Sequence, residues 1–93
     1  MLTSDNPGDQ TVPEMVKLSG KVEEGLIPSE KIVRVEDADG GFEEVPVSAR
    51  SINEGRLLAA EVGSQGDRVL VELPRESASG KWRMWVKRSA VGA

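Results

Sequence analysis

The feature that most constrains this 93-residue chain is a pair of alternating apolar runs, residues 68–73 and 81–86, joined by a polar loop that ends at Gly80. Because successive side chains of a strand point to opposite faces, each run predicts a strand with one apolar face. One antiparallel register satisfies both runs, and its inward-facing pairs are Leu73–Trp82, Val71–Met84 and Val69–Val86. On the outer face this register pairs Leu70 with Trp85 and Glu72 with Arg83. The two runs therefore predict a β-hairpin.

Shorter apolar runs separated by turn residues predict further strands. We expect them over residues 14–22, with a bulge or bend at Gly20, and over residues 31–36, 42–47 and 56–62. A single helical turn is expected near Ser48, and residues 87–91 are expected to form a short turn or a final half-strand. Pro46 lacks an N–H group, which places the 42–47 strand at a sheet edge or beside a bulge. The loop at residues 23–29 is expected to tuck Leu26 and Ile27 beneath it.

Side-chain pairing predicts how some of these strands are aligned. For residues 56–62 and the first strand of the hairpin, the expected pairs are Ala60–Val69, Leu58–Val71 and Glu61–Arg68, with a loop over residues 63–66. For the strands at 31–36 and 42–47, the expected pairs are Val35–Phe42 and Arg34–Glu43. The second alignment brings Val45 opposite Val33 only if an extra residue is absorbed near Glu44.

These elements predict an all-β protein, a small antiparallel barrel or sandwich of five to six short strands with at most one helical turn. Residues 1–13, rich in polar residues, Pro and Gly, are expected to be a disordered tail, and residues 14–93 a single small β-barrel domain. Over about residues 55–91 the pattern is similar to SH3-like small barrels, in which a tryptophan-bearing strand is followed by a short turn and a last strand. An SH3-like barrel is therefore the preferred fold. A five-stranded oligonucleotide/oligosaccharide-binding barrel is the alternative, although that fold usually contains a helix and is usually longer.

The composition argues against several kinds of chemistry. The chain has no cysteine and no histidine, so it lacks disulfides, thiolate nucleophiles, zinc-finger ligands and the usual general base near neutral pH. Its serines have no histidine partner, its acidic pairs do not match a calcium loop, and its glycines do not form a phosphate-binding loop. We expect no enzymatic activity, no metal and no cofactor. The polar N-terminus and the lack of a long apolar run favour a cytoplasmic protein without membrane segments.

Charge and aromatic residues are unevenly distributed. Residues 1–65 carry a net charge of −7 and residues 66–93 a net charge of +3. This asymmetry indicates either a basic binding face or two halves that attract each other across a small fold. The chain has three aromatic side chains, Phe42, Trp82 and Trp85, and each is expected to carry a large share of the buried surface.

Trp85 is the candidate functional residue, because the hairpin register places it on the outer face. Together with it we expect the partner-binding residues Leu70, Lys81, Arg83 and Lys87. A tryptophan there has three interpretations: a second core layer, an anchor for a protein partner, or a stacking platform for a nucleobase.

The preferred hypothesis is a non-catalytic module that binds a protein partner or its own copy, through this face or through the strand edge at residues 42–47. The alternative is a nucleic-acid-binding barrel that uses Arg68, Lys81, Arg83, Trp85, Lys87 and Arg88. A pI near 4.8 weighs against that alternative.

Overall fold

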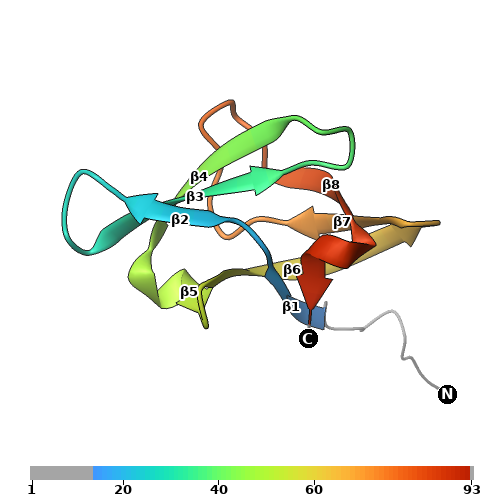
Figure 1. Ribbon diagram of the computed structural model, residues 1–93, viewed down its shortest axis with the longest axis horizontal. Coiled ribbons are helices and arrows are strands. Elements are labelled where there is room, and N and C mark those ends of the chain that lie inside the picture. Colours follow the sequence, from blue (N-terminus) through green and yellow to red (C-terminus); the bar gives the residue numbers. More distant parts are fainter. Residues whose placement is uncertain (1–13, 93) are drawn as a thin grey trace, which may run out of the picture.

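The computed structural model describes residues 14–92, which form two antiparallel sheets (Figure 1). The strands are β1 (Glu14–Leu18), β2 (Lys21–Glu24), β3 (Glu30–Glu36), β4 (Phe42–Ser48), β5 (Ile52–Asn53), β6 (Arg56–Gln65), β7 (Arg68–Glu72), β8 (Arg83–Lys87) and β9 (Val91–Gly92). Two short 3-10 turns, η3 (Ala49–Ser51) and η4 (Arg88–Ala90), are the helical elements of this range. The tail predicted at residues 1–13 lies outside the described residues.

The larger sheet has the strand order β8-β7-β6-β1-β9, with β5 paired to β6, and the smaller sheet has the order β2-β3-β4. The all-β antiparallel prediction is confirmed, but of the predicted barrel or sandwich the barrel is wrong, because the two sheets are not closed into one, and residues 14–92 form nine strands instead of five to six. No strand ladder within residues 14–92 joins the two sheets. Single backbone hydrogen bonds bridge them instead, from Ala38 N to Trp85 O at 2.8 Å and from Ala78 N to Glu44 O at 2.7 Å.

The core fills the space between the two sheets and is entirely aliphatic apart from one methionine. Its buried members are Val16, Leu18, Val33, Val35, Val45, Val47, Leu57, Ala59, Val69, Val71, Leu73, Met84 and Val86. The expectation that the aromatic residues carry the burial is wrong for Phe42 and Trp82, which are 52% and 54% exposed. Alternating β-branched residues fill this small interior without rings, because they pack well on a pleated surface.

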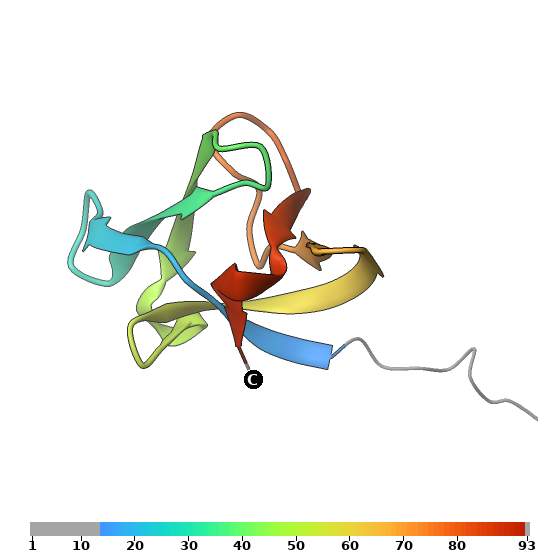
Figure 2. The same cartoon turned by 45° about the vertical axis from the view of Figure 1, so that its right-hand side comes forward.

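One bent segment carries the chain from the larger sheet into the smaller one, as Figure 2 shows where β1 continues into β2. The single strand predicted over residues 14–22 is divided at Ser19 and Gly20 into β1 and β2, which belong to different sheets, so the predicted interruption at Gly20 separates two strands. A Cβ at Gly20 would lie 2.8 Å from Val33 Cγ1 and 2.9 Å from the carbonyl oxygen of Arg34. Only a residue without a side chain fits here unless the neighbouring strand shifts.

The β7–β8 hairpin has the predicted register. Val71 pairs with Met84, Leu70 with Trp85, Val69 with Val86 and Glu72 with Arg83 as predicted, whereas the predicted pair Leu73–Trp82 lies beyond the end of the ladder. The N–H of Leu73 donates to the carbonyl of Trp82 at 2.8 Å. However, β8 begins only at Arg83, and the indole of Trp82 is exposed instead of lying in the core.

The predicted third strand is present, but its register is different. β6 extends to Gln65, and a bulge between Glu61 and Gly63 brings Ser64 opposite Val69, and Ala60 opposite Glu72. The predicted alignments of residues 58, 60 and 61 are therefore wrong. The expected loop at residues 63–66 shortens to a two-residue turn, in which Gly66 adopts a φ of 59°.

In the β3–β4 hairpin, Val33 pairs with Val45 and Val35 with Glu43, without a bulge. The predicted pairing of Val35 with Phe42 is therefore wrong by one residue. This register turns Glu43 inward and Phe42 outward. The prediction that the strand containing Pro46 lies at a sheet edge is confirmed.

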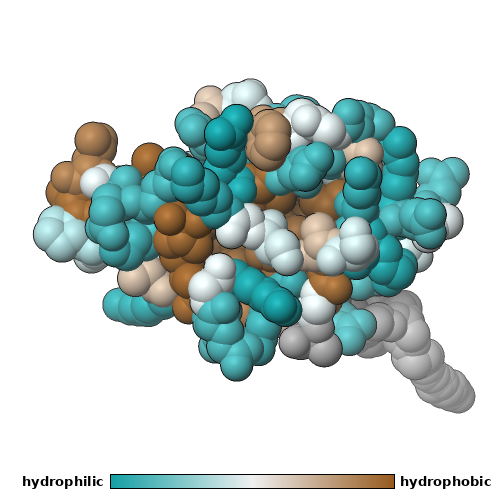
Figure 3. Space-filling view, viewed as in Figure 1, coloured by the Kyte–Doolittle hydropathy of each residue, from teal (hydrophilic) through white to brown (hydrophobic). Residues whose placement is uncertain are grey.

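The β2–β3 loop projects from the molecule and does not cover apolar side chains as expected. Leu26 is 94% exposed and Ile27 is 57% exposed. In Figure 3 the brown side chains at the left end lie where Figure 1 places this loop. The predicted helical turn after Ser48 is confirmed as η3, since the Ser48 hydroxyl accepts a hydrogen bond from the N–H of Arg50 at 3.2 Å.

Candidate interaction surface

The outer face of β7 and β8 carries three cross-strand pairs in a row. Arg68 lies opposite Lys87, Leu70 opposite Trp85, and Glu72 opposite Arg83. Leu70 and Trp85 are half-buried, because each covers part of the other. The structure thus brings together four of the five predicted site residues, namely Leu70, Arg83, Trp85 and Lys87.

Lys81, the fifth predicted residue, is not part of this row. It precedes β8, and its ammonium group lies 3.4 Å from the Glu43 carboxylate of the smaller sheet. Arg83 has an acidic neighbour as well, with its Nε 3.6 Å from Glu72 Oε2. The surface around Trp85 is therefore closer to neutral than the sequence pattern indicated.

A groove of about 200 Å³ lies beside Trp82 on the same side of the larger sheet. Ala60 faces outward in this sheet, because it pairs with Glu72 on one side and with Met15 on the other. The lining residues are Met15, Leu58, Ala59, Ala60, Glu72, Leu73, Pro74 and Trp82. We call this feature the Trp82 groove. Met15 is 58% exposed, so two large apolar side chains of the groove are open to solvent.

Sequence reasoning missed the Trp82 groove, because it placed Trp82 in the core. Pro74 follows the end of β7 and Trp82 precedes β8, so both lie where the alternation of the strands no longer holds. The polar loop between the two strands was the available signal that the inward-outward pattern ends here. The outer face of the larger sheet consequently has two apolar areas, the Leu70–Trp85 pair and the Trp82 groove, separated by the Glu72–Arg83 pair.

Phe42 forms a separate exposed aromatic feature on the smaller sheet. The guanidinium of Arg34 lies 4.1 Å from the centre of its ring, a cation–π contact. Phe42 and Arg34 both line two hollows, of about 300 and 280 Å³. This feature lies at the edge strand β4, the second contact region that the sequence analysis named.

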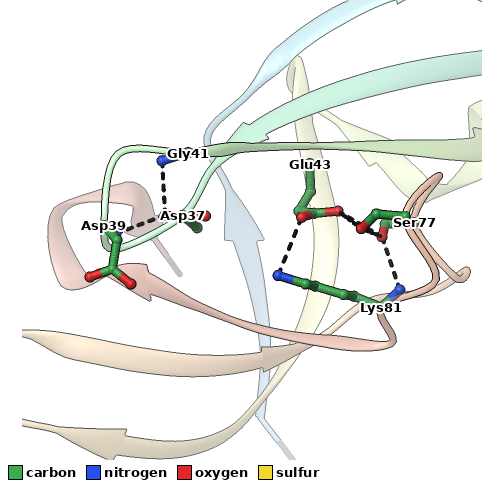
Figure 4. A network of polar contacts seen from close by, with 7 residues as sticks. Asp37, Asp39, Gly41, Glu43, Ser77 and Lys81 are labelled. Carbon is green, nitrogen blue, oxygen red and sulfur yellow. Dashed lines mark hydrogen bonds and ion pairs between the residues drawn. The ribbon is translucent and has the colours of Figure 1, made fainter.

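A buried carboxylate anchors the β7–β8 loop to the smaller sheet (Figure 4). Glu43 is 8% exposed and accepts hydrogen bonds from the hydroxyls of Ser77 at 2.8 Å and Ser79 at 2.6 Å. Those two hydrogen bonds and the charge of Lys81 hold the pKa of the Glu43 carboxyl below its ordinary value, against the opposing effect of burial. Every group in the network has a partner, so it acts as a structural anchor.

Asp37 closes the β3–β4 turn in a similar way. Its carboxylate accepts hydrogen bonds from the N–H groups of Asp39 at 2.7 Å and Gly41 at 3.0 Å, as Figure 4 shows. These backbone donors lower the pKa of Asp37. The ionised carboxylate of Asp37 therefore stabilises the turn.

Residues 14–92 hold no group of three or more metal-ligating side chains. They also contain no helix with the length and apolar character that a membrane crossing requires.

Comparison with known proteins gives no relative from which a function could be transferred: no family model, no curated protein and no solved structure matches the chain.

Proposed function

We propose that this protein is a non-catalytic interaction module that binds a protein partner through the outer face of its larger sheet. The observation that carries the proposal is the position of the aromatic residues. The core contains none of them, and Trp82 is more than half exposed beside the similarly exposed Met15. A small domain gains stability from burying an indole, so exposing one is costly unless another surface covers it.

The proposed contact surface consists of the Trp82 groove and the Leu70–Trp85 pair. Tryptophan is enriched at the energetic centres of protein interfaces, where it fills a pocket or offers a flat apolar surface. The Glu72–Arg83 pair between the two areas supplies polar groups that a partner can hydrogen-bond. A second copy of the chain is a partner of the same class.

Nucleic-acid binding is the weaker candidate. Arg68, Lys81 and Arg83, three of the cations proposed for it, have acidic neighbours in Asp39, Glu43 and Glu72 respectively. The net charge of −4 adds a general repulsion of polyphosphates. Both facts favour a protein partner.

We also infer that the domain is related in architecture to SH3-like small barrels, in an open form. The support is the order β8, η4, β9, in which a tryptophan-bearing strand is followed by a short turn and a last strand. This comparison concerns the fold alone and supplies no ligand.

Photo-crosslinking tests the proposed surface. A benzophenone amino acid is placed at position 82 in one variant and at position 50 in a control, because Arg50 is exposed on η3 and does not line the Trp82 groove. After irradiation in the host cell, we expect one recurrent protein adduct from position 82 that is absent from position 50. A Met15→Lys substitution in the position-82 variant should remove that adduct. Identical adduct patterns from both positions would refute the proposed surface.

A further inference from the structure

A cation-lined cavity lies at one end of the β7–β8 ladder. Its volume is about 460 Å³, and its lining residues are Ala38, Asp67, Arg68, Lys87, Arg88 and Ser89. The three cations come from the start of β7, the end of β8 and the first residue of η4. The β3–β4 turn adds Ala38, whose N–H donates to the carbonyl of Trp85. We call this feature the cation cavity.

The charges of the cation cavity are only partly balanced. Arg68 and Lys87 face each other across the two strands, and like charges in directly opposed positions destabilise a sheet. Asp39 lies 2.9 Å from the Arg68 guanidinium and offsets one charge. Among the described residues, no carboxylate lies within 4 Å of the charged groups of Lys87 or Arg88. Asp67 lines the cavity too, and its carboxylate offsets part of the positive charge from beyond 4 Å, while its backbone carbonyl accepts the N–H of Arg88 at 2.7 Å.

The cation cavity adjoins the apolar part of the proposed surface, although neither Leu70 nor Trp85 lines it. The Leu70–Trp85 pair follows the Arg68–Lys87 pair on the same face, two residues further along each strand. Two residues of an extended chain span roughly 6.6 Å. A bound segment in extended conformation also presents every second side chain to one face, at the same spacing.

We propose that the partner segment of this module is an acidic, extended peptide, with a carboxylate in the cation cavity and an apolar side chain two residues away on the Leu70–Trp85 pair. This inference rests on the proposed function and specifies the chemistry of its partner. A carboxylate supplies the counter-charge that no residue within 14–92 places within 4 Å of the charged groups of Lys87 and Arg88, and it relieves the repulsion between Arg68 and Lys87. A peptide matches the alternation of one charged and one apolar position, whereas a nucleic-acid strand carries a phosphate at every nucleotide and would also bring charge to the apolar Leu70–Trp85 pair.

Synthetic peptides test the inference directly. The probe is an acetylated nonapeptide with a central Glu-Ser-Leu motif in a Gly/Ser background. The comparison peptides carry Lys-Ser-Leu or Glu-Ser-Ser instead, and a ten-nucleotide oligothymidylate represents nucleic acid. Amide chemical shifts of the full chain are followed by NMR at low salt. We expect the Glu-Ser-Leu peptide to shift the amides of Arg68, Trp85, Lys87 and Arg88, and each comparison peptide to bind at least tenfold more weakly.

Charge reversal supplies the matched comparison. Lys87→Glu combined with Arg88→Glu should weaken binding of the Glu-Ser-Leu peptide by tenfold or more. Arg75→Glu makes the same kind of change at an exposed arginine outside the cavity lining and should alter affinity less than twofold. Equal affinity of the double variant and the parent chain for the Glu-Ser-Leu peptide, or binding of the oligothymidylate without binding of the peptide, would overturn the inference.

The proposed interaction surface and the proposed acidic partner can be refuted independently of each other. A specific crosslink from position 82 without peptide binding refutes the acidic segment and leaves the interaction surface standing. Peptide binding without a specific crosslink refutes the Trp82 groove as a contact and leaves the cation cavity as the binding site.

Discussion

Removing the Glu43 carboxylate should destabilise the protein by about 3 kcal/mol. In Glu43→Ala the Ser77 hydroxyl, which is 5% exposed, loses a charged acceptor and can reach little water. A hydrogen bond to a charged group contributes about 1.5–3 kcal/mol. Ser79 is more exposed and can bond to water instead, so its lost hydrogen bond adds about 1 kcal/mol. Lys81 is half exposed, and its ion pair adds less than about 1 kcal/mol.

Glu44 provides a matched control on the same strand. Its side chain points to the opposite face and is exposed, so Glu44→Ala should change the free energy of unfolding by less than about 0.5 kcal/mol. Its carbonyl, which accepts from the N–H of Ala78, is unaffected by the substitution. Urea denaturation followed by far-ultraviolet circular dichroism measures both variants at pH 7.

The same variants give a pH dependence with a fixed sign. Because the folded state lowers the pKa of Glu43, the stabilisation by its carboxylate is complete above the unfolded-state pKa of about 4.3. It is lost as the pH falls through the lower folded-state pKa. The difference between the parent chain and Glu43→Ala should therefore be largest at pH 7 and shrink below about pH 4. Equal destabilisation by Glu43→Ala and Glu44→Ala, or a difference independent of pH, would refute the anchoring role.

Three other outcomes follow from the backbone and the turns. Gly20→Ala should destabilise the protein by about 1–3 kcal/mol in urea denaturation, because the added Cβ would lie less than 3 Å from atoms of the neighbouring strand. Gly63→Ala should lower the free energy of unfolding by less, since its Cβ would lie no closer than 3.6 Å to another atom. Glu54→Gly should relieve the strain of a φ of 55° in the β5–β6 turn, but it also removes the ion pair with Lys17. Because 1 M salt screens that ion pair, the thermal midpoint of the variant should rise above that of the parent chain at this salt concentration. Asp37→Asn should weaken the β3–β4 turn at pH 7 and approach the parent chain at pH 3, as measured by thermal midpoints, and a constant difference between these pH values would contradict this.

The β7–β8 hairpin was predictable from the sequence, because several independent pairings agree on one register. Alternation, the Glu72–Arg83 charge pair and the aliphatic pairs all select the same alignment. Trp82 was misplaced because the alternation was extended one residue beyond the start of β8 at Arg83. Periodicity describes side chains only while the strand geometry lasts.

The register of β3 and β4 shows a different limit. An aromatic ring buries more apolar surface than a glutamate does, which favours a register with Phe42 inside. The chain instead buries Glu43, whose hydrogen-bond partners Ser77 and Ser79 lie 34 and 36 residues away. Local patterns do not contain such distant partners. The Leu70–Trp85 pair was predicted from the sequence. The Trp82 groove was not, because it depends on how β6 and β1 lie beside Trp82.

An interior without aromatic rings has a spectroscopic consequence. Both indoles of this protein belong to its outer face, so its intrinsic fluorescence senses the solvent and whatever rests on that face more than it senses the packing between the sheets. Trp82 and Trp85 therefore serve as built-in optical probes, and each can be assigned by replacing the other with phenylalanine. A ligand that docks on this face would shift the wavelength of tryptophan emission, without any dye attached to the protein.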